Sequence, residues 1–157
     1  MNKKAIGLLG AVLVGLVVLV IVLTRPGAAQ TMPAQDEGSM DPQKLMIPRW
    51  FLSSLTLDGK QIELLGNQMT LQFEEGGKAN GDAACNGFFT DYQAAADGSM
   101  KFGPIGATKM FCEIGMDQED ALFQALEKVE HFRVEGGKLT LSSADGQTVL
   151  VYSMPPK

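Results

Sequence analysis

Cys85, Cys112 and His131 are the residues of this chain whose types could carry chemistry. A thiol activated by a histidine is a nucleophile, and two thiols with an imidazole could hold a metal ion. The two cysteines could instead join two neighbouring segments of a small β-rich fold through a disulfide, or both could be buried as free thiols. His131 is the one histidine and begins an expected strand, so a satisfied or exposed imidazole is the preferred interpretation.

The remaining polar residues do not complete a catalytic set. Asp82, Asp91 and Asp97 flank the stretch around Cys85, but the spacing fixes no pair of carboxylates, so it gives no argument for general acid–base catalysis. The two cysteines and His131 match no compact zinc spacing, and the chain has no glycine-rich phosphate loop. We therefore expect no catalytic residues, no metal and no cofactor, with a Cys-dependent enzyme as the weaker alternative.

The start of the chain indicates a membrane segment. Lys3 and Lys4 precede residues 5–24, which carry no charge. At ~1.5 Å per residue this run spans about 30 Å, enough for the hydrocarbon core of a bilayer. We expect an uncleaved, single-pass anchor over residues 1–24, with cleavage near Ala29 as the alternative. The lysines place the N-terminus in the cytoplasm, so the rest would lie in the bacterial periplasm.

Residues 25–48 are predicted to form a flexible tether because they combine prolines with small and polar residues. Residues 49–157 are long enough for one domain with a modest core. This domain has nine Lys and Arg against fifteen Asp and Glu, a net charge of −6. Nucleic acid is therefore not an expected partner, and membrane contact is expected through residues 5–24 alone.

The domain shows strand and turn patterns with one helix. Alternation predicts a half-buried strand over Gln68–Glu74, and Gly81 indicates a bulge or a close backbone approach in the next strand. Asp117 is a candidate cap for an amphipathic helix whose apolar stripe must pack against the sheet. We expect the aromatic residues between the two cysteines to lie in the core. Further strands are predicted over Arg49–Leu57, Lys78–Asp82, Cys85–Tyr92, Met100–Phe102, His131–Glu135, Lys138–Ser142 and Thr148–Ser153, with an irregular Ile105–Cys112.

Four features in order give the chain a resemblance to a known family. Trp50 and Leu52 precede an Asp58-Gly59 turn, and a Cys-Asn-x-Phe-x-x-x-Tyr pattern begins at Cys85. The sequence Thr-Lys-Met-Phe-Cys ends at Cys112, and the helix is followed by closing strands. Over about Trp50–Tyr152 the chain resembles the META domain family, which includes the heat-shock protein HslJ. It departs from the usual family glycines at Ala84 and Thr90.

The resemblance implies an α+β domain in which a strongly bent antiparallel sheet packs around one main helix. It implies an envelope protein associated with stress and no established catalytic residues. We expect a non-catalytic, membrane-tethered periplasmic protein that binds a partner or supports the envelope, the partner being an unknown envelope protein or an apolar ligand. A structural, pilot-like accessory of a membrane complex is the alternative. A disulfide is expected between Cys85 and Cys112, and the other motif residues, Trp50, Asn86, Phe88, Tyr92 and Thr108, are expected to be structural.

Overall fold

The computed structural model describes residues 38–47, 49–65 and 68–155. All the described elements belong to one compact unit of the chain. The membrane anchor predicted over residues 1–24 lies outside the described residues. Within the described ranges, no helix has the length and apolar character needed to cross a bilayer. The elements are η1 (Pro42–Leu45), β1 (Trp50–Leu57), β2 (Lys60–Ile62), β3 (Thr70–Glu74), β4 (Lys78–Ala83), β5 (Asn86–Ala94), β6 (Met100–Phe102), β7 (Gly106–Ala107), α1 (Met116–Glu127), β8 (His131–Glu135), β9 (Lys138–Ser142) and β10 (Val149–Ser153).

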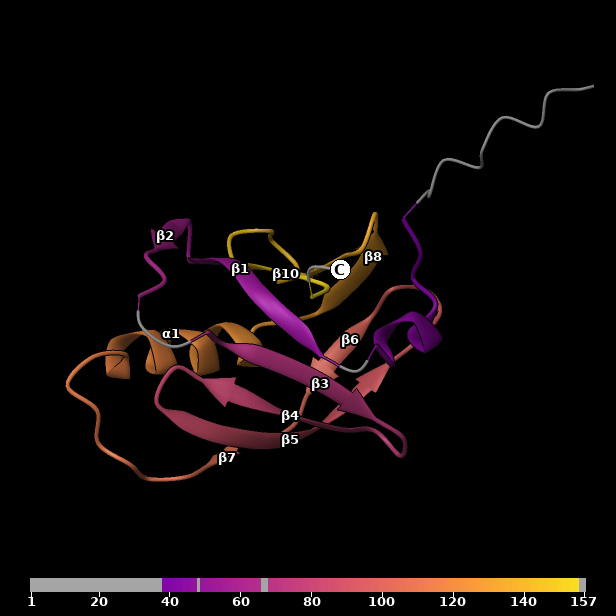
Figure 1. Ribbon diagram of the computed structural model, residues 1–157. Coiled ribbons are helices and arrows are strands. Elements are labelled where there is room, and N and C mark those ends of the chain that lie inside the picture. Colours follow the sequence, from indigo (N-terminus) through magenta and orange to yellow (C-terminus); the bar gives the residue numbers. More distant parts are fainter. Residues whose placement is uncertain (1–37, 48, 66–67, 156–157) are drawn as a thin grey trace, which may run out of the picture. The chain divides into compact units, whose positions relative to one another are not determined.

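The strands form one antiparallel sheet in the order β6-β5-β4-β3-β1-β10-β9-β8, with β2 beside β1 and β7 beside β5 (Figure 1). The two ends of this order meet. Met100 N donates to Glu130 O at 2.9 Å, and Phe132 N donates to Gly98 O at 2.8 Å. Because these hydrogen bonds join the edges, the sheet is a near-barrel, and the predicted α+β class with a bent antiparallel sheet and one helix is confirmed.

Strand β1 is where the sheet bends. Trp50 and Phe51 pair with β3, whereas Leu55–Leu57 pair with β2 on the same side of the strand. On its other side β1 pairs with β10, and the register shifts between Leu52 and Ser54. Such a bulge increases the local twist of a strand. One strand therefore belongs to both halves of the barrel.

The core lies between the inner face of the sheet and α1. Ala121, Leu122, Ala125 and Leu126 are buried, which is the helical spacing that the sequence predicts. The helix packs against β1, β4 and β6 and lies alongside the sheet in Figure 1. Its partners in the core include fully buried residues of four strands, namely Trp50, Leu55, Leu71, Leu139, Leu141, Leu150 and Tyr152.

The helix does not begin as predicted. Its cap is Gly115, in the left-handed conformation with φ of 105°, and no side chain caps it. Asp117 is instead exposed in the first turn. The predicted Asp117 cap was wrong because the preceding loop enters the helix through a left-handed residue, a conformation that glycine adopts without strain.

Residues 38–47 belong to the folded domain. Leu45 is fully buried, and Trp50 Nε1 donates to its carbonyl oxygen at 3.0 Å. Ser39 pairs with Val134 through two backbone hydrogen bonds of 2.7 and 2.8 Å. In Figure 1, η1 lies at the opposite end of the barrel from α1. The domain therefore begins before Arg49, and the last part of the expected tether is a packed segment that pairs with β8 at Val134, next to the contact between β8 and the β5–β6 turn.

Gly81 is the close backbone approach that the sequence predicts. A Cβ atom at this position would lie 2.0 Å from the carbonyl oxygen of Thr70. Thr70 Oγ1 donates to Asp82 at 2.9 Å and accepts from Asp82 N at 3.1 Å, so β3 and β4 are drawn together beside the glycine. Only a residue without a side chain fits there.

Candidate functional site

Asn86 links two distant parts of the chain. It begins β5 and is 2% exposed. Its Oδ1 accepts hydrogen bonds from Thr108 Oγ1 and from Met110 N, both at 2.7 Å. Its Nδ2 donates to Met110 O at 3.2 Å and to Glu119 Oε1 at 2.9 Å. All the polar atoms of this amide are therefore used to hold the chain around Thr108 and Met110 against the helix.

Glu119 completes this arrangement. It lies in the first turn of α1, is 5% exposed, and its Oε2 accepts from Asn86 N at 2.8 Å. A buried carboxylate is tolerated where hydrogen bonds and a helix N-terminus offset its lost hydration. The sequence does not distinguish Glu119 from a surface residue, because a carboxylate in the first turn of a helix is common at exposed positions too.

A disulfide fixes the far end of the same segment. Cys85 and Cys112 are joined in the structure, with their Cα atoms 6.0 Å apart. Cys85 directly precedes Asn86. These two neighbouring residues therefore hold the segment from Thr108 to Cys112, Asn86 through hydrogen bonds and Cys85 through the disulfide. Residues 108–115, which we call the docking loop, are thereby attached at Thr108, Met110 and Cys112.

The docking loop exposes apolar side chains. Phe111 is 84% exposed, Ile114 67% and Met110 58%. The exposure of Phe111 contradicts the expectation that the aromatic residues between the two cysteines lie in the core, an expectation that Phe88 meets. Phe89 is exposed as well, because β5 alternates and places Phe88 inside and Phe89 outside. A loop this firmly attached keeps its apolar side chains in solvent instead of folding them inward.

Among the other motif residues, Trp50 and Phe88 lie in the core and Tyr92 packs against it, partly buried. Trp50 is fully buried and Phe88 is 3% exposed, with its ring edge-on to that of Phe123 at 5.7 Å. Tyr92 meets Phe73 edge-on at 4.8 Å, and burial raises the pKa of the Tyr92 hydroxyl. These residues stabilise the barrel, whereas Thr108 belongs to the Asn86 network.

Ala84 stands where the family usually has a glycine, and its backbone adopts the left-handed conformation that glycine favours. Its φ is 67°, in the left-handed region, and it forms the turn between β4 and β5. The turn geometry that the family glycine would provide is therefore kept by an alanine.

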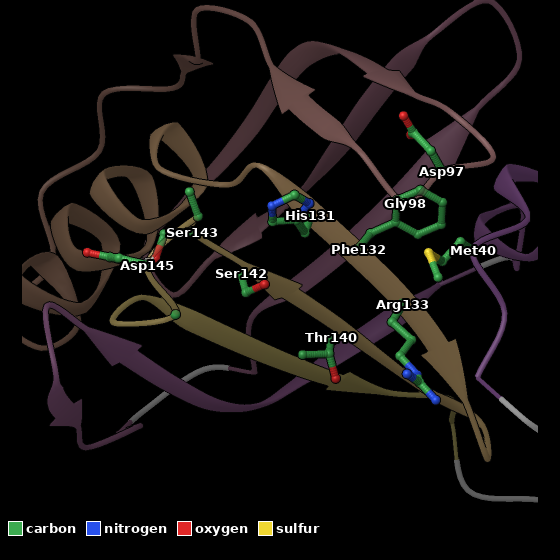
Figure 2. A pocket seen from close by; sticks show the side chains of 12 residues that line it. Met40, Asp97, Gly98, His131, Phe132, Arg133, Thr140, Ser142, Ser143 and Asp145 are labelled. Carbon is green, nitrogen blue, oxygen red and sulfur yellow. Dashed lines mark hydrogen bonds between the residues drawn. The ribbon is translucent and has the colours of Figure 1, made fainter.

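His131 lines a different concavity. This depression of about 540 Å³ lies over β8 and β9, between the β5–β6 turn and the β9–β10 turn (Figure 2). Neither cysteine lines it. Its lining is Met40, Asp97, Gly98, His131, Phe132, Arg133, Thr140, Ser142, Ser143, Ala144, Asp145 and Gly146.

The two aspartates of this concavity are held by their own turns. Asp97 Oδ1 accepts from Ser99 Oγ at 2.7 Å and from Ser99 N at 2.9 Å, and the Ser99 hydroxyl is the main cause that lowers the Asp97 pKa. Asp145 accepts from Ser143 Oγ at 2.6 Å and from Gln147 N at 2.9 Å, and the Ser143 hydroxyl is the main cause that lowers its pKa. Such local hydrogen bonds stabilise turns, so both carboxylates have a structural role.

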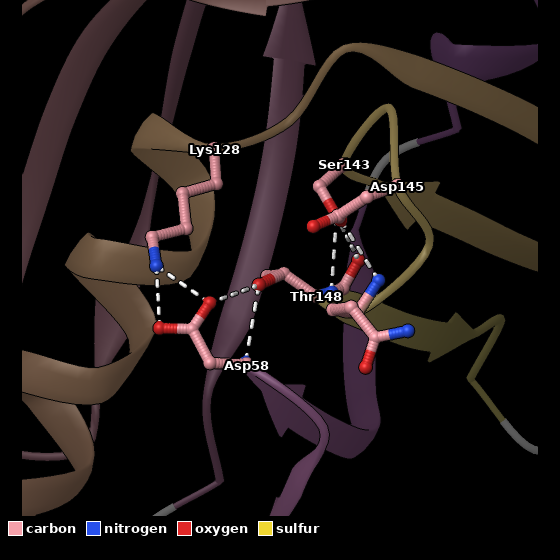
Figure 3. Close-up of polar contacts among 6 residues, drawn as sticks. Asp58, Lys128, Ser143, Asp145 and Thr148 are labelled. Carbon is pink, nitrogen blue, oxygen red and sulfur yellow. Dashed lines mark hydrogen bonds and ion pairs between the residues drawn. The ribbon is translucent and has the colours of Figure 1, made fainter.

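A further polar cluster joins the helix to the sheet (Figure 3). Lys128 Nζ donates to both oxygens of Asp58 at 2.6 Å. Asp58 N donates to Thr148 Oγ1 at 3.3 Å, and Thr148 is 1% exposed. This cluster fixes the β1–β2 turn against the C-terminus of α1 and carries no group aimed at a ligand.

A groove adjoins the docking loop. It encloses about 560 Å³ between the β2–β3 connection and the start of α1. Leu65 N donates to Gln118 Oε1 at 2.7 Å and ties the two walls together. The lining consists of Lys60, Ile62, Glu63, Leu65, Glu113, Ile114, Gly115, Met116, Asp117 and Gln118. This groove could not be predicted from the sequence, because only the fold brings the β2–β3 connection next to the start of α1.

Solved structures share this fold. An NMR structure of a protein from Burkholderia xenovorans is similar at 25% identity with a TM-score of 0.61, over 73% of this chain and 86% of that one. Another protein solved by NMR matches at 21% identity and a TM-score of 0.54, over 72% and 93% of the two chains. A crystal structure of a DUF4847 family protein from Bacteroides vulgatus matches at 10% identity and a TM-score of 0.55, over 73% and 97%.

The comparison with curated proteins finds no match. A model of the META domain family matches residues 43–155, which begin within η1 and end just after β10. The match thus takes in every strand of the barrel and its helix, and the chain belongs to the META domain family.

Proposed function

We propose that this protein is a non-catalytic binding module of the bacterial cell envelope. The docking loop carries the proposal, because it holds Met110, Phe111 and Ile114 in solvent while Asn86 and the disulfide fix its backbone. Exposed apolar side chains that gather in one place mark interaction surfaces. A surface that is already ordered loses little conformational entropy when a partner binds.

The cellular setting comes from the sequence. Residues 5–24 anchor the chain in the inner membrane, and the META domain lies in the periplasm, where it supports the envelope under stress. An oxidising periplasm favours the bond between Cys85 and Cys112. Recovery of the mature protein in the soluble periplasmic fraction, beginning at Gln30, would contradict the anchor.

The site geometry favours binding over catalysis. Cys85 and Cys112 are bonded to each other, and His131 lines a concavity that neither of them reaches. A nucleophilic thiolate next to a base is therefore not assembled. Turnover by the purified protein that is lost in Cys85→Ala or His131→Ala would assign the protein to the enzymes instead.

Site-specific crosslinking in living cells tests the binding surface. A photoreactive phenylalanine analogue replaces Phe111 in the full-length protein, and the same analogue at exposed Gln93 is the control. We expect crosslinked products from position 111 that position 93 does not give. One stoichiometric product indicates an accessory of a membrane complex, and many products indicate a chaperone-like role. Equal patterns from the two positions would refute the docking loop as the binding surface.

A further inference from the structure

The groove beside the docking loop has apolar side chains on both of its walls. Leu65 is 51% exposed on one wall and Ile114 67% on the other, and Ile62 and Met116, both partly buried, also line it. Its volume of about 560 Å³ is in the range of sites that bury a small ligand or a few side chains of a peptide. Ile114 belongs to both the docking loop and the groove, so the two form one continuous surface.

The groove is held in shape before anything binds. The hydrogen bond from Leu65 N to Gln118 Oε1 joins its walls, and Gln118 is only 7% exposed. Gly115, at the base of one wall, is packed so closely that an added Cβ would lie 3.2 Å from Ala84. A ready-made groove of this kind binds a short segment without first having to order itself.

The charges around the groove select its occupant. Glu63, Glu113 and Asp117 line it together with one amine, Lys60. In the described part of the chain, none of the three carboxylates is within ion-pair distance of a Lys or Arg side chain. The groove thus combines apolar side chains with an excess of negative charge, on a domain that is itself acidic.

This combination disfavours two other occupants. An anionic lipid surface would bring its phosphates against Glu63, Glu113 and Asp117, which repel them. A second copy of this chain in a two-fold dimer would place the same carboxylates against themselves, because such an interface uses one patch twice.

We propose that the groove binds an extended segment of a partner protein in which apolar side chains alternate with Lys or Arg. The apolar side chains would contact Leu65 and Ile114, and the cations would face the three carboxylates. The proposal rests on the proposed function, since it names the kind of partner that the surface beside the docking loop accepts.

Short peptides test this chemistry on the full-length protein in nanodiscs of zwitterionic lipid, with empty nanodiscs subtracted. The probe is a fluorescent, capped pentapeptide of alternating Lys and Leu, and the comparison peptides replace Lys by Glu or Leu by Ser. We expect the Lys/Leu peptide to bind at least about tenfold more tightly than either comparison peptide by fluorescence anisotropy. Higher salt should weaken this binding because it screens the cation–carboxylate attraction.

Matched variants locate the binding. The triple variant Glu63→Gln, Glu113→Gln and Asp117→Asn removes the three groove charges. It should weaken binding of the Lys/Leu peptide by about tenfold or more. The control, Glu75→Gln with Glu127→Gln and Glu130→Gln, changes the net charge equally at exposed positions outside the groove and should leave binding unchanged. Leu65→Ser with Ile114→Ser should weaken binding through the apolar contacts.

Three results would overturn the inference. Equal binding of the Glu/Leu peptide is one, and unchanged binding by the groove-charge variant is another. The third is concentration-dependent self-association, or binding to anionic vesicles, that the Leu65→Ser and Ile114→Ser changes abolish. Failure of the peptide test alongside specific crosslinks from position 111 would remove this partner class and leave the proposed function standing. Failure of both would remove the proposed function too.

Discussion

Glu119 on α1 accepts hydrogen bonds from both the backbone N–H and the side-chain amide of Asn86, at 2.8 and 2.9 Å. One carboxylate of the helix therefore fixes both the start of β5 and the orientation of the amide that holds the docking loop. Because both residues are buried, water cannot replace either bond when one is lost.

Glu119→Gln should destabilise the domain. One carboxylate oxygen becomes an NH₂ group that faces a donor of Asn86, so a buried donor is left without an acceptor. The expected loss in the free energy of unfolding is about 1–3 kcal/mol, measured by urea denaturation. Asp120→Asn is the control, because Asp120 is the exposed neighbour on the same helix and should change stability by less than about 0.5 kcal/mol. Equal stability of the two variants would contradict the role given to Glu119.

Gly81→Ala should be among the most damaging single changes in the sheet. The new methyl group would lie 2.0 Å from the carbonyl oxygen of Thr70, and backbone cannot move aside as a flexible side chain can. We expect the free energy of unfolding to fall by about 1–3 kcal/mol or more, which a lower thermal midpoint would show. Gly146→Ala is a useful comparison, because no atom lies within 4 Å of the added Cβ and only its φ of 69° opposes the change. If Gly81→Ala proved as stable as the parent, β3 and β4 would have to be further apart than described.

The strands and the helix could be predicted because their signals are local. His131–Glu135 and Lys138–Ser142 agree with β8 and β9 at both ends, since alternation and the Gly136-Gly137 turn fix such a hairpin. Gly81 was recognisable for the same reason: a glycine within a strand implies a close approach.

The closure of the barrel and the candidate site depend on contacts between distant residues. Nothing near Ser39 in the sequence indicates that it pairs with Val134. The apolar ring of Phe111 predicts a place in the core, yet Asn86 and the disulfide hold its loop outward. Glu119 has the pattern of an ordinary first-turn carboxylate, and only the fold brings it to Asn86.

Tyr152→Phe should leave stability unchanged or raise it. Tyr152 is fully buried, and within the described residues its hydroxyl has no hydrogen-bond partner; burial raises its pKa. Removing an unsatisfied hydroxyl removes its desolvation cost, so a gain of about 0–2 kcal/mol is expected in urea denaturation. Tyr92→Phe is the comparison, since its hydroxyl has only a weak contact with Met46 Sδ at 3.9 Å. A loss above about 1 kcal/mol for Tyr152→Phe would show that the hydroxyl has a partner.

The two turn aspartates should contribute to acid sensitivity. Hydrogen bonds from Ser99 and Ser143 lower the pKa values of Asp97 and Asp145 from 3.8 in the folded state. A lowered pKa adds stability that is fully present above the unfolded value and is lost as the pH falls through the folded one. The double variant Ser99→Ala and Ser143→Ala should therefore lose less stability than the parent as the pH falls through 3.8 and below it.

The control for this pH dependence is Ser53→Ala. Ser53 Oγ donates to Ser153 Oγ at 3.0 Å and, among the described residues, forms no hydrogen bond with a carboxylate, so its removal should shift the whole stability curve without changing its slope. Thermal midpoints measured across the acid range give the comparison. Parallel curves for the parent and the Ser99→Ala, Ser143→Ala variant would contradict the prediction.

The disulfide should matter to the domain and to the docking loop in separable ways. A bond that closes a loop of about 28 residues contributes roughly 3–4 kcal/mol on the chain-entropy view. Cys85→Ser with Cys112→Ser should lower the free energy of unfolding by an amount of this order. Mass spectrometry of the unreduced parent should find neither thiol open to alkylation, and labelling of both without reductant would exclude the bond.

The docking loop should respond before the domain unfolds. Asn86 still holds Thr108 and Met110 when the disulfide is absent, whereas Cys112 loses its attachment. Limited proteolysis under native conditions should therefore cut the double-serine variant after Phe111 while the parent resists. Adding Asn86→Ala should extend cleavage toward Lys109, because the side-chain amide that holds Thr108 Oγ1 and Met110 N is then lost. If the double-serine variant resisted cleavage as well as the parent does, the Asn86 network alone would fix the loop, and the disulfide would stabilise the barrel without shaping the binding surface.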